Sequence, residues 1–458
     1  MKRCHVMAVL AVGFFPLSAC GGASNVAFAP RVPVTDVRRL TDILYNFGAL
    51  PDAQYPYAGL LAGKKGEYYG TTLGGGSGPS DGDGTVYEIT AAGKEKVLYS
   101  FQYGNDGAES DSPLIADKSG ALYGVTIFGG GSSACNSGCG TVFKLSPGKS
   151  GWSESVLYAF QGGANDGAWP YGGLVMNKSG AILGTTARGG GSTFCGGSNG
   201  CGVVFELTPS GTTYTEKVVH AFKSGPPDGL APFDALVADS KGNLYGTTFY
   251  GGLATGDCKK SPSGIPGCGT VFKLTPSGST YTESVLYRFK GGIDGRYPRA
   301  SLLPGAKGVL YGLTEQGGAK KGTGNGTSFE LTPKGSSYTE KVIYSFQGGS
   351  DGSDPDDNPG LTADTSGAIY GTTTDGGGAS ACSGGCGTIF KLTPSGSSFT
   401  ESVLYAFQGG TDGVSPYGGV VIDGKAKLLG PTFFGGSGSC QLSSKSPLGC
   451  GTIFSVTR

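Results

Sequence analysis

The sequence predicts an all-β fold, a seven-bladed β-propeller with four-stranded blades in which the N-terminal strand completes the last blade. Three observations support this prediction. Short strand-like phrases recur seven times along the 458 residues. The recurrences are spaced by about 60 residues, the length of a four-stranded unit that cannot bury its faces alone. Their order also leaves one strand of the last blade missing unless the chain closes into a ring.

Three kinds of phrase predict three of the four strands in each blade. The second strand is typified by EYYGTT from Glu67, the third by GTVFKLT from Gly269, and the outer, fourth strand by VLYAF from Val156. Each phrase alternates β-branched or aromatic residues with small or polar ones and is bounded by turn-forming residues, a pattern typical of short strands. A weaker first strand, such as residues 174–176, precedes each second strand. No segment shows helical periodicity, so the blades are predicted to be built from strands alone.

The order of the phrases predicts how the ring closes. An outer-strand phrase comes first, at residues 41–47, and the chain stops after a third-strand phrase that begins at Gly451. Seven outer strands therefore exist only if the N-terminal one pairs with the last blade, whereas a linear solenoid would need polar caps instead. The predicted propeller spans 40–458, with blades at about 49–102, 103–161, 162–222, 223–289, 290–346, 347–407 and 408–458 plus 40–48.

Composition and charge argue against two classes of protein. Glycine supplies 89 of 458 residues, well over twice its usual share of about 7%, while aromatic residues remain at 10% and make a core available. Lysine plus arginine equals aspartate plus glutamate at 34 each, and no stretch is basic enough to follow a phosphate backbone. The sequence therefore argues against a disordered chain and against a nucleic-acid partner.

The N-terminal residues predict an export signal. Two basic residues precede an apolar run at 6–17 that is too short to span a bilayer, and the run ends in LSAC, which resembles the bacterial lipobox. We expect a lipoprotein signal peptide at 1–19, a lipidated Cys20 and a tether at 20–39. Gly21 after the cysteine favours an outer-membrane or cell-surface location. The alternative is plain secretion with cleavage near an Ala-x-Ala-like site.

Five elements of the repeat follow one another in a fixed order: LYGTT, a GG pair, GTVFKLTP, VLYSF and GGxDG. With them the chain resembles the GloVer-type tandem repeat of bacterial surface proteins, a family with varied anchors, across residues 40–458. The resemblance implies a secreted or surface location and brings with it no established activity.

Ten cysteines remain when Cys4 and Cys20 are set aside, and they form five local pairs. Each pair lies between a second-strand and a third-strand phrase, and even, local pairing in an exported chain predicts disulfides that each close one loop. A zinc site would need four converging ligands, and each loop offers two. The predicted disulfides join Cys135 to Cys139, Cys195 to Cys201, Cys258 to Cys268, Cys382 to Cys386 and Cys440 to Cys450.

His220 is the only histidine outside the predicted signal peptide, and it replaces the tyrosine of an outer-strand phrase. We expect a surface substitution, because catalytic triads and histidine-ligated metals need a histidine in a cleft. The aspartates that precede glycine after most outer strands are expected to cap turns, with a calcium site as the less favoured alternative. We therefore predict no metal and no cofactor.

The loops that lead from one blade into the next emerge on the same face as the cysteine-bearing loops, and function is expected on this face. Their aromatic residues either wedge between neighbouring blades or form a platform for flat apolar sugar faces. Arg299 and Asp356 replace the aromatic residue in the fifth and sixth blades and make the ring asymmetric. The candidate ligand-binding residues are Tyr57, Trp169, Tyr171, Phe233, Tyr297, Arg299, Asp356 and Tyr417.

A binding or scaffold lipoprotein is the main functional prediction, because repetition without a unique polar constellation suits recognition of an extended partner. Its partners would be the membrane, through the lipid anchor, and an extracellular glycan or protein. The alternative is a carboxylate-dependent carbohydrate-active enzyme, a glycoside hydrolase or lyase, which needs two acids about 5–9.5 Å apart on one face. A purely structural surface protein is the third interpretation. The acids that an enzyme could use are Asp81, Asp83, Asp354, Asp356 and Asp357.

Overall fold

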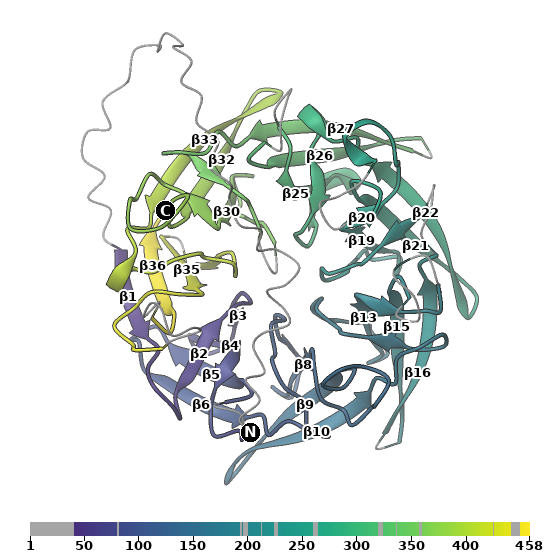
Figure 1. The fold of residues 1–458 in the computed structure, drawn as a ribbon, viewed down its shortest axis with the longest axis vertical. Coiled ribbons are helices and arrows are strands. Elements are labelled where there is room, and N and C mark those ends of the chain that lie inside the picture. The colour runs from purple at the N-terminus through teal and green to yellow at the C-terminus, as the bar shows by residue number, and fades with distance from the viewer. Residues whose placement is uncertain are drawn as a thin grey trace.

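Seven antiparallel blades form a closed ring, which confirms the predicted seven-bladed β-propeller (Figure 1). The computed structural model describes residues 41–79, 82–192, 195, 200–211, 213–223, 228–259, 264–318, 324–335, 337–356, 360–424, 426–440 and 449–458. The predicted signal peptide, tether and lipidated Cys20, and the acids Asp81 and Asp357, lie outside the described residues. Within this part of the chain, no helix has the length and apolar character needed to cross a bilayer.

Each blade runs outward from a short first strand at the centre of the ring to an outer strand at its rim (Figure 1). The first strands are β3 (Leu61–Ala62), β7 (Ile115–Ala116), β12 (Val175–Met176), β18 (Val237–Ala238), β24 (Leu303–Pro304), β29 (Thr362–Ala363) and β34 (Val421–Asp423). The second strands are β4 (Glu67–Gly75), β8 (Leu122–Thr126), β13 (Ile182–Thr186), β19 (Leu244–Thr248), β25 (Leu310–Gln316), β30 (Ile369–Thr373) and β35 (Lys427–Thr432). The third strands are β5 (Thr85–Thr90), β9 (Thr141–Gly148), β15 (Val203–Ser210), β21 (Thr270–Ser277), β26 (Thr327–Lys334), β32 (Thr388–Ser395) and β36 (Thr452–Thr457). The outer strands are β6 (Glu95–Ser100), β10 (Gly151–Ala159), β16 (Thr213–Ala221), β22 (Thr280–Arg288), β27 (Ser337–Ser345), β33 (Ser398–Ala406) and β1 (Thr41–Asn46).

The N-terminal strand closes the ring as the sequence predicts. β1 pairs antiparallel with β36, with Asp42 opposite Ser455 and Tyr45 opposite Ile453. The last blade therefore has the order β1-β36-β35-β34 and takes its outer strand from the opposite end of the chain. This pairing removes the exposed edge that β36 would otherwise present.

The repeated glycine of the second strand and the repeated aromatic residue of the third strand form one packing unit. In the second blade Gly124 lies opposite Phe143, and a Cβ on this glycine would come within 2.6 Å of the phenylalanine ring. The ring of Phe143 also meets the ring of Phe101, from the end of the preceding outer strand, edge to face with centroids 5.1 Å apart. Such edge-to-face pairs stabilise an aromatic core beyond the area they bury. The equivalent pairs are Phe47–Tyr87, Phe160–Phe205, Phe222–Phe272, Phe289–Phe329, Phe346–Phe390 and Phe407–Phe454.

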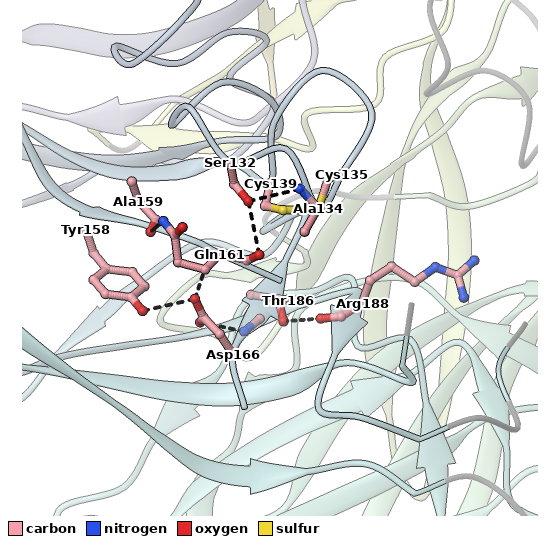
Figure 2. Close-up of a disulfide and its surroundings, with 11 residues drawn as sticks. Ser132, Ala134, Cys135, Cys139, Tyr158, Ala159, Gln161, Asp166, Thr186 and Arg188 are labelled. Carbon is pink, nitrogen blue, oxygen red and sulfur yellow. Dashed lines mark hydrogen bonds between the residues drawn. A yellow bond between two sulfur atoms is a disulfide. The ribbon is translucent and has the colours of Figure 1, made fainter. Parts of the chain in front are cut away.

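All five predicted disulfides are confirmed, and each closes the loop between a second and a third strand. These loops also form hydrogen bonds with the segment that leads into the following blade. We call the segment from the outer strand of one blade to the first strand of the next the entry loop. Beside the Cys135–Cys139 bond, Ser132 Oγ donates to the carbonyl of Gln161 in the next entry loop over 3.1 Å (Figure 2). The disulfides therefore fix the loops against which the entry loops are anchored.

A second contact between blades joins an outer-strand tyrosine to an entry-loop aspartate. Tyr158 O–H donates to Asp166 Oδ2 over 3.0 Å, and the same carboxylate accepts the N–H groups of Gln161 and Gly167, the turn-capping role predicted from the sequence (Figure 2). Glu216 of the next outer strand also lies close enough to this junction for the charge of Asp166 to raise its pKa. The equivalent tyrosine–aspartate pairs are Tyr45–Asp52, Tyr99–Asp106, Tyr287–Asp294, Tyr344–Asp351 and Tyr405–Asp412.

The junction glutamates hold their protons to unusually high pH. Burial, and then the charge of the neighbouring aspartate, raise the pKa of Glu216 and Glu401 to about 7 and that of Glu340 to about 8. Burial and an aspartate likewise raise the pKa of Glu95, Glu154 and Glu283 to about 7. Neutral glutamates therefore belong to the most stable form of the ring.

We expect the protein to lose stability as the pH rises from about 4.5, the ordinary pKa of a glutamate, to about 8. A glutamate whose pKa is raised on folding stabilises the fold fully below its unfolded pKa, and this contribution disappears as the pH rises through the folded value. The window follows from the pKa of about 7 at Glu401 and about 8 at Glu340. Thermal melts across this range measure the loss, and the double variant Glu340→Gln, Glu401→Gln should show a flatter profile. An unchanged slope in the double variant would contradict the assignment.

Candidate active site at the centre of the ring

One residue in every entry loop adopts a left-handed backbone conformation. In the third blade this residue is Trp169, whose N–H donates to the carbonyl of Cys139 over 2.9 Å and whose carbonyl accepts the N–H of Ala187 over 3.0 Å. The two hydrogen bonds offset the cost of a conformation that side chains other than glycine rarely adopt. The left-handed residues are Tyr55, Glu109, Trp169, Ala231, Tyr297, Asp354 and Ser415, with φ between 53° and 60°.

The residue two places further along each entry loop forms a ring of seven, one from each blade. We call these residues the central ring: Tyr57, Asp111, Tyr171, Phe233, Arg299, Asp356 and Tyr417. Six of them, all but Tyr417, line one small pocket together with Asp234. Because the left-handed residues are pinned by backbone hydrogen bonds, the seven side chains are presented from equivalent positions.

Arg299 connects three blades across the pocket. Its Nε lies 3.1 Å from Asp356 Oδ2, its Nη2 donates to Tyr57 Oη over 3.1 Å, and its Nη1 lies 3.9 Å from Glu315 Oε2. The guanidinium carbon also lies 5.8 Å from the centre of the Phe233 ring, which is within the range of a cation–π contact. The side chain of Arg299 keeps 27% of its surface exposed, so a ligand in the pocket can reach it.

Asp111 and Asp356 are two buried carboxyl groups of the same pocket in different electrostatic environments. Asp111 is 3% exposed, and burial raises its pKa well above the usual range despite the opposing charge of Arg299. Burial also raises the pKa of Asp356, but the ion pair with Arg299 and a hydrogen bond from Tyr57 oppose the change. Asp111 therefore favours the protonated form more strongly than Asp356 does.

Further carboxyl groups surround the pocket. Burial raises the pKa of Asp234 and of Glu315 to about 7, and Asp234 Oδ2 accepts a hydrogen bond from Thr247 over 2.6 Å. Burial raises the pKa of Glu109 to about 7 and that of Asp354 well above its usual range. In the described part of the chain Arg299 is the only cation that lines the pocket. Several of these acids therefore keep their protons near neutral pH.

Aromatic rings supply the apolar part of the pocket. Tyr57 and Tyr417 stack with ring centres 4.7 Å apart, and Tyr171 meets Phe233 edge to face at 5.3 Å. All four side chains are partly exposed. The pocket thus combines flat apolar surfaces with proton-bearing groups, the combination that a sugar ring and its hydroxyls need.

The structure brings together six of the eight ligand-binding candidates predicted from the sequence and separates two. Tyr57, Tyr171, Phe233, Arg299, Asp356 and Tyr417 belong to the central ring. Tyr297 is 3% exposed and stacks on Phe249 at 5.0 Å, as the wedge interpretation expects. Trp169 holds the left-handed position and does not line the pocket. The aromatic residues of the entry loops therefore divide between packing and the pocket according to their position in the loop.

Sequence reasoning missed three acids of the site. Asp111 stands three residues before the first apolar residue of its first strand, the same register as Tyr57 and Arg299, so alignment of the repeats could have found it. Asp234 and Glu315 each depart from the repeat. The position of Asp234 is held by Ser112 in the second blade and by Gly418 in the seventh, and the position of Glu315 is held by an apolar residue in other blades, such as Phe433 in the seventh. The detectable signal was a charged residue at a repeat position that other blades fill with small or apolar residues.

The pocket acids are arranged for proton transfer rather than for metal binding. Across the described ranges, the only three histidine, cysteine or carboxylate groups with ligand atoms within 4.8 Å of one another are found elsewhere, at His220. Two carboxyl groups with separated proton affinities in one pocket supply an acid and a base. The site can therefore protonate one oxygen and activate a water molecule in the same reaction.

A family model for the Gloeobacter/Verrucomicrobia repeat matches residues 32–195 and 191–454. The chain belongs to this family. Two matches to the Gloeobacter/Verrucomicrobia repeat cover nearly the whole propeller, which confirms the resemblance drawn from the sequence. Five disulfides are typical of an oxidising compartment, so this member of the family is an exported protein. A search of curated protein sequences finds no match.

Several solved structures share the propeller fold with this Gloeobacter/Verrucomicrobia repeat protein. An ulvan lyase of polysaccharide lyase family PL25 is 11% identical, with a TM-score of 0.49 and coverage of 89% of this chain and 94% of the lyase. A putative 6-phosphogluconolactonase from Bacteroides uniformis is 12% identical, with a TM-score of 0.45 and coverage of 78% and 85%. A gluconolactonase from Xanthomonas campestris is 9% identical, with a TM-score of 0.40 and coverage of 91% and 89%. At these values the likeness is one of fold.

These findings correct the main functional prediction. A binding or scaffold module was predicted because the repeats showed no unique polar constellation, whereas the ring gathers Asp111, Asp234, Arg299, Glu315 and Asp356 around one pocket. The binding-module prediction is therefore wrong, because its premise that the repeats gather no unique polar constellation does not hold.

Proposed function

We propose that the protein is a glycoside hydrolase whose active site is the central pocket. The observation that carries the proposal is the pair of buried carboxyl groups, Asp111 and Asp356, that line one pocket, the first with a pKa raised well above its usual range and the second in an ion pair with Arg299. Glycoside hydrolysis by two carboxylates requires this division into an acid and a base or nucleophile.

In the proposed reaction Asp111 is the general acid. Its carboxyl proton moves to the glycosidic oxygen while the bond from that oxygen to the anomeric carbon breaks, and the bonding pair leaves with the protonated alcohol. Asp356, paired with Arg299, takes a proton from the water that adds to the anomeric carbon. Return of this proton to Asp111 through solvent completes the cycle, with one water consumed for each bond cleaved.

Hydrolysis of a neutral saccharide is favoured over elimination from a uronate. A lyase must neutralise the carboxylate of its substrate, but Arg299 is paired with Asp356 and approaches Glu315, and acids outnumber cations around the pocket. The one cation that lines the pocket among the described residues is thus already paired and is poorly placed to neutralise a uronate. Burial also raises the pKa of Tyr57 well above its usual range, which makes its phenolate a poor candidate for the base.

The proposal is tested by incubating the purified chain with a panel of neutral and uronate-containing oligosaccharides and separating the products by mass. We expect water-added fragments from neutral substrates. Unsaturated fragments from uronates would show a lyase instead, and a complete lack of cleavage across the panel would overturn both.

We further propose that export ends in lipidation of Cys20 and anchoring to the outer membrane. The lipobox-like LSAC and the following Gly21 support this location. In a bacterial host, the full chain should partition with membranes and the Cys20→Ser variant should not. Equal partitioning of the two chains would contradict the anchor.

A further inference from the structure

One junction between blades departs from the tyrosine–aspartate pattern. Between the third and fourth blades the outer-strand tyrosine is replaced by His220, which lies at the end of β16 opposite Val204 of β15. Asp228 holds the usual aspartate position, and Glu283 of β22 holds the usual glutamate position. His220 is partly buried in this junction instead of lying on the open surface that the sequence led us to expect.

The ligand atoms of His220, Asp228 and Glu283 all lie within 4.8 Å of one another. The Asp228 carboxylate is fixed in place, because its Oδ2 accepts the N–H of Lys223 over 2.8 Å and its Oδ1 accepts the N–H of Gly229 over 2.7 Å. The imidazole ring is held edge to face against Phe222 at 4.6 Å. Two of the three side chains are thus oriented by contacts outside the group.

Two buried atoms of this group lack hydrogen-bond partners among the described residues. They are His220 Nε2 and Glu283 Oε1, and only the nitrogen is special to this junction, because the equivalent glutamate oxygen also lacks a partner at the other junctions. Leaving the buried imidazole nitrogen unsatisfied costs free energy, and native structures pair such atoms with a protein group, a water or an ion. At the other junctions the tyrosine hydroxyl supplies a donor to the aspartate, as Tyr158 does to Asp166. Histidine removes that hydroxyl and puts a ring nitrogen in its place.

We propose that His220, Asp228 and Glu283 bind a divalent metal ion, with zinc the best match to the chemistry of the ligands. Zinc binds imidazole nitrogen together with carboxylate oxygen, and three protein ligands leave the fourth position for water. Burial lowers the pKa of His220 and so favours the neutral, ligating form. The charges of Lys223 and Arg288 oppose a cation here, so the site is expected to be weaker than one without them.

The metal would join two blades, since His220 lies in β16 of the third and Glu283 in β22 of the fourth. Its role would be to stabilise this junction, well separated in the fold from the central pocket. Binding would compete with protons, because the pKa of Glu283 is raised to about 7.

The repeat supplies a matched control, since His220→Tyr restores the residue found at the other junctions. Tag-free full-length chain, stripped with a chelator, is titrated with zinc chloride in a calorimeter and in thermal melts. We expect one zinc ion per chain, an increase in the melting temperature with zinc, and loss of both in His220→Tyr. Glu283→Gln should weaken zinc binding by at least about tenfold, as expected for a lost ligand.

A gain-of-function variant keeps the test decisive if a loss-of-function variant fails to fold. Tyr287→His creates the same three ligand types beside Asp294 and Glu340 and should add a second zinc ion per chain. Zinc binding that persists in His220→Tyr, or an absence of zinc binding by the unaltered chain, would overturn the proposal.

Discussion

Replacing Asp111 by asparagine is expected to lower kcat/KM on a saccharide substrate by about 10²- to 10⁴-fold, the usual contribution of a general acid. Asparagine keeps the shape of the side chain but has no proton to donate to the glycosidic oxygen. Since the carboxyl group is 3% exposed and its pKa lies well above the usual range, the substitution removes a neutral acid and leaves the charge of the pocket nearly unchanged. The fold should therefore survive.

The choice of leaving group separates a catalytic from a structural effect. An aryl glycoside whose phenolate leaves without protonation does not need the acid, so Asp111→Asn should retain far more activity on it than on an oligosaccharide. The pH profile gives a second measure. Activity of the unaltered enzyme should fall as the pH rises through the pKa of Asp111, and this alkaline limb should vanish in the variant. Equal losses on both substrates would remove Asp111 from the role of acid.

Asp356→Asn provides the complementary control. Asp356 is paired with Arg299 over 3.1 Å, so its loss leaves a buried guanidinium without its main counter-charge. We expect activity to fall on both kinds of substrate, because the base or nucleophile is needed whichever group leaves. Different responses of Asp111→Asn and Asp356→Asn to the leaving group would assign one role to each carboxyl group.

Removing residues 41–47 is expected to lower the free energy of unfolding by more than about 3–5 kcal/mol, the cost of truncating a buried phenylalanine alone. Phe47 is fully buried and packs edge to face on Tyr87 of the first blade. The deletion also removes the β1–β36 pairing and the hydrogen bond from Tyr45 to Asp52. Urea or thermal unfolding of the truncated chain should show an earlier transition.

A rearranged chain tests whether the effect comes from ring closure. In the other blades a tight turn joins the third strand to the outer strand, as between Ser395 of β32 and Ser398 of β33. Residues 41–47 placed after Arg458 through a Gly-Ser turn should therefore restore most of the lost stability. If the truncated chain unfolds like the full one, the closing strand is unimportant to the ring; if the rearranged chain recovers nothing, the loss has another cause.

The architecture of this protein could be predicted from its sequence because the information is local and repeated. Alternation around Gly124 and Phe143 specifies strands, and the position of 41–47 before any complete blade specifies the closure. The disulfides could also be predicted, because partners four to ten residues apart, such as Cys382 and Cys386, leave little choice of pairing. Strand type, ring closure and disulfide pairing depend on neighbours in the chain or on the count of repeats, and not on distant contacts.

The candidate site was decided by the tertiary structure. Tyr57 and Arg299 are 242 residues apart and meet only because the ring closes. Asp111 stands in a visible repeat register, but its high pKa comes from burial where the entry loops converge, and no local pattern encodes that burial. From the sequence alone His220 was likewise predicted to be a surface substitution, and only the fold shows that it lies beside Asp228 and Glu283. Sequence periodicity fixes which side chains occupy equivalent positions, whereas their charge and chemistry depend on desolvation and on neighbours that only the closed ring supplies.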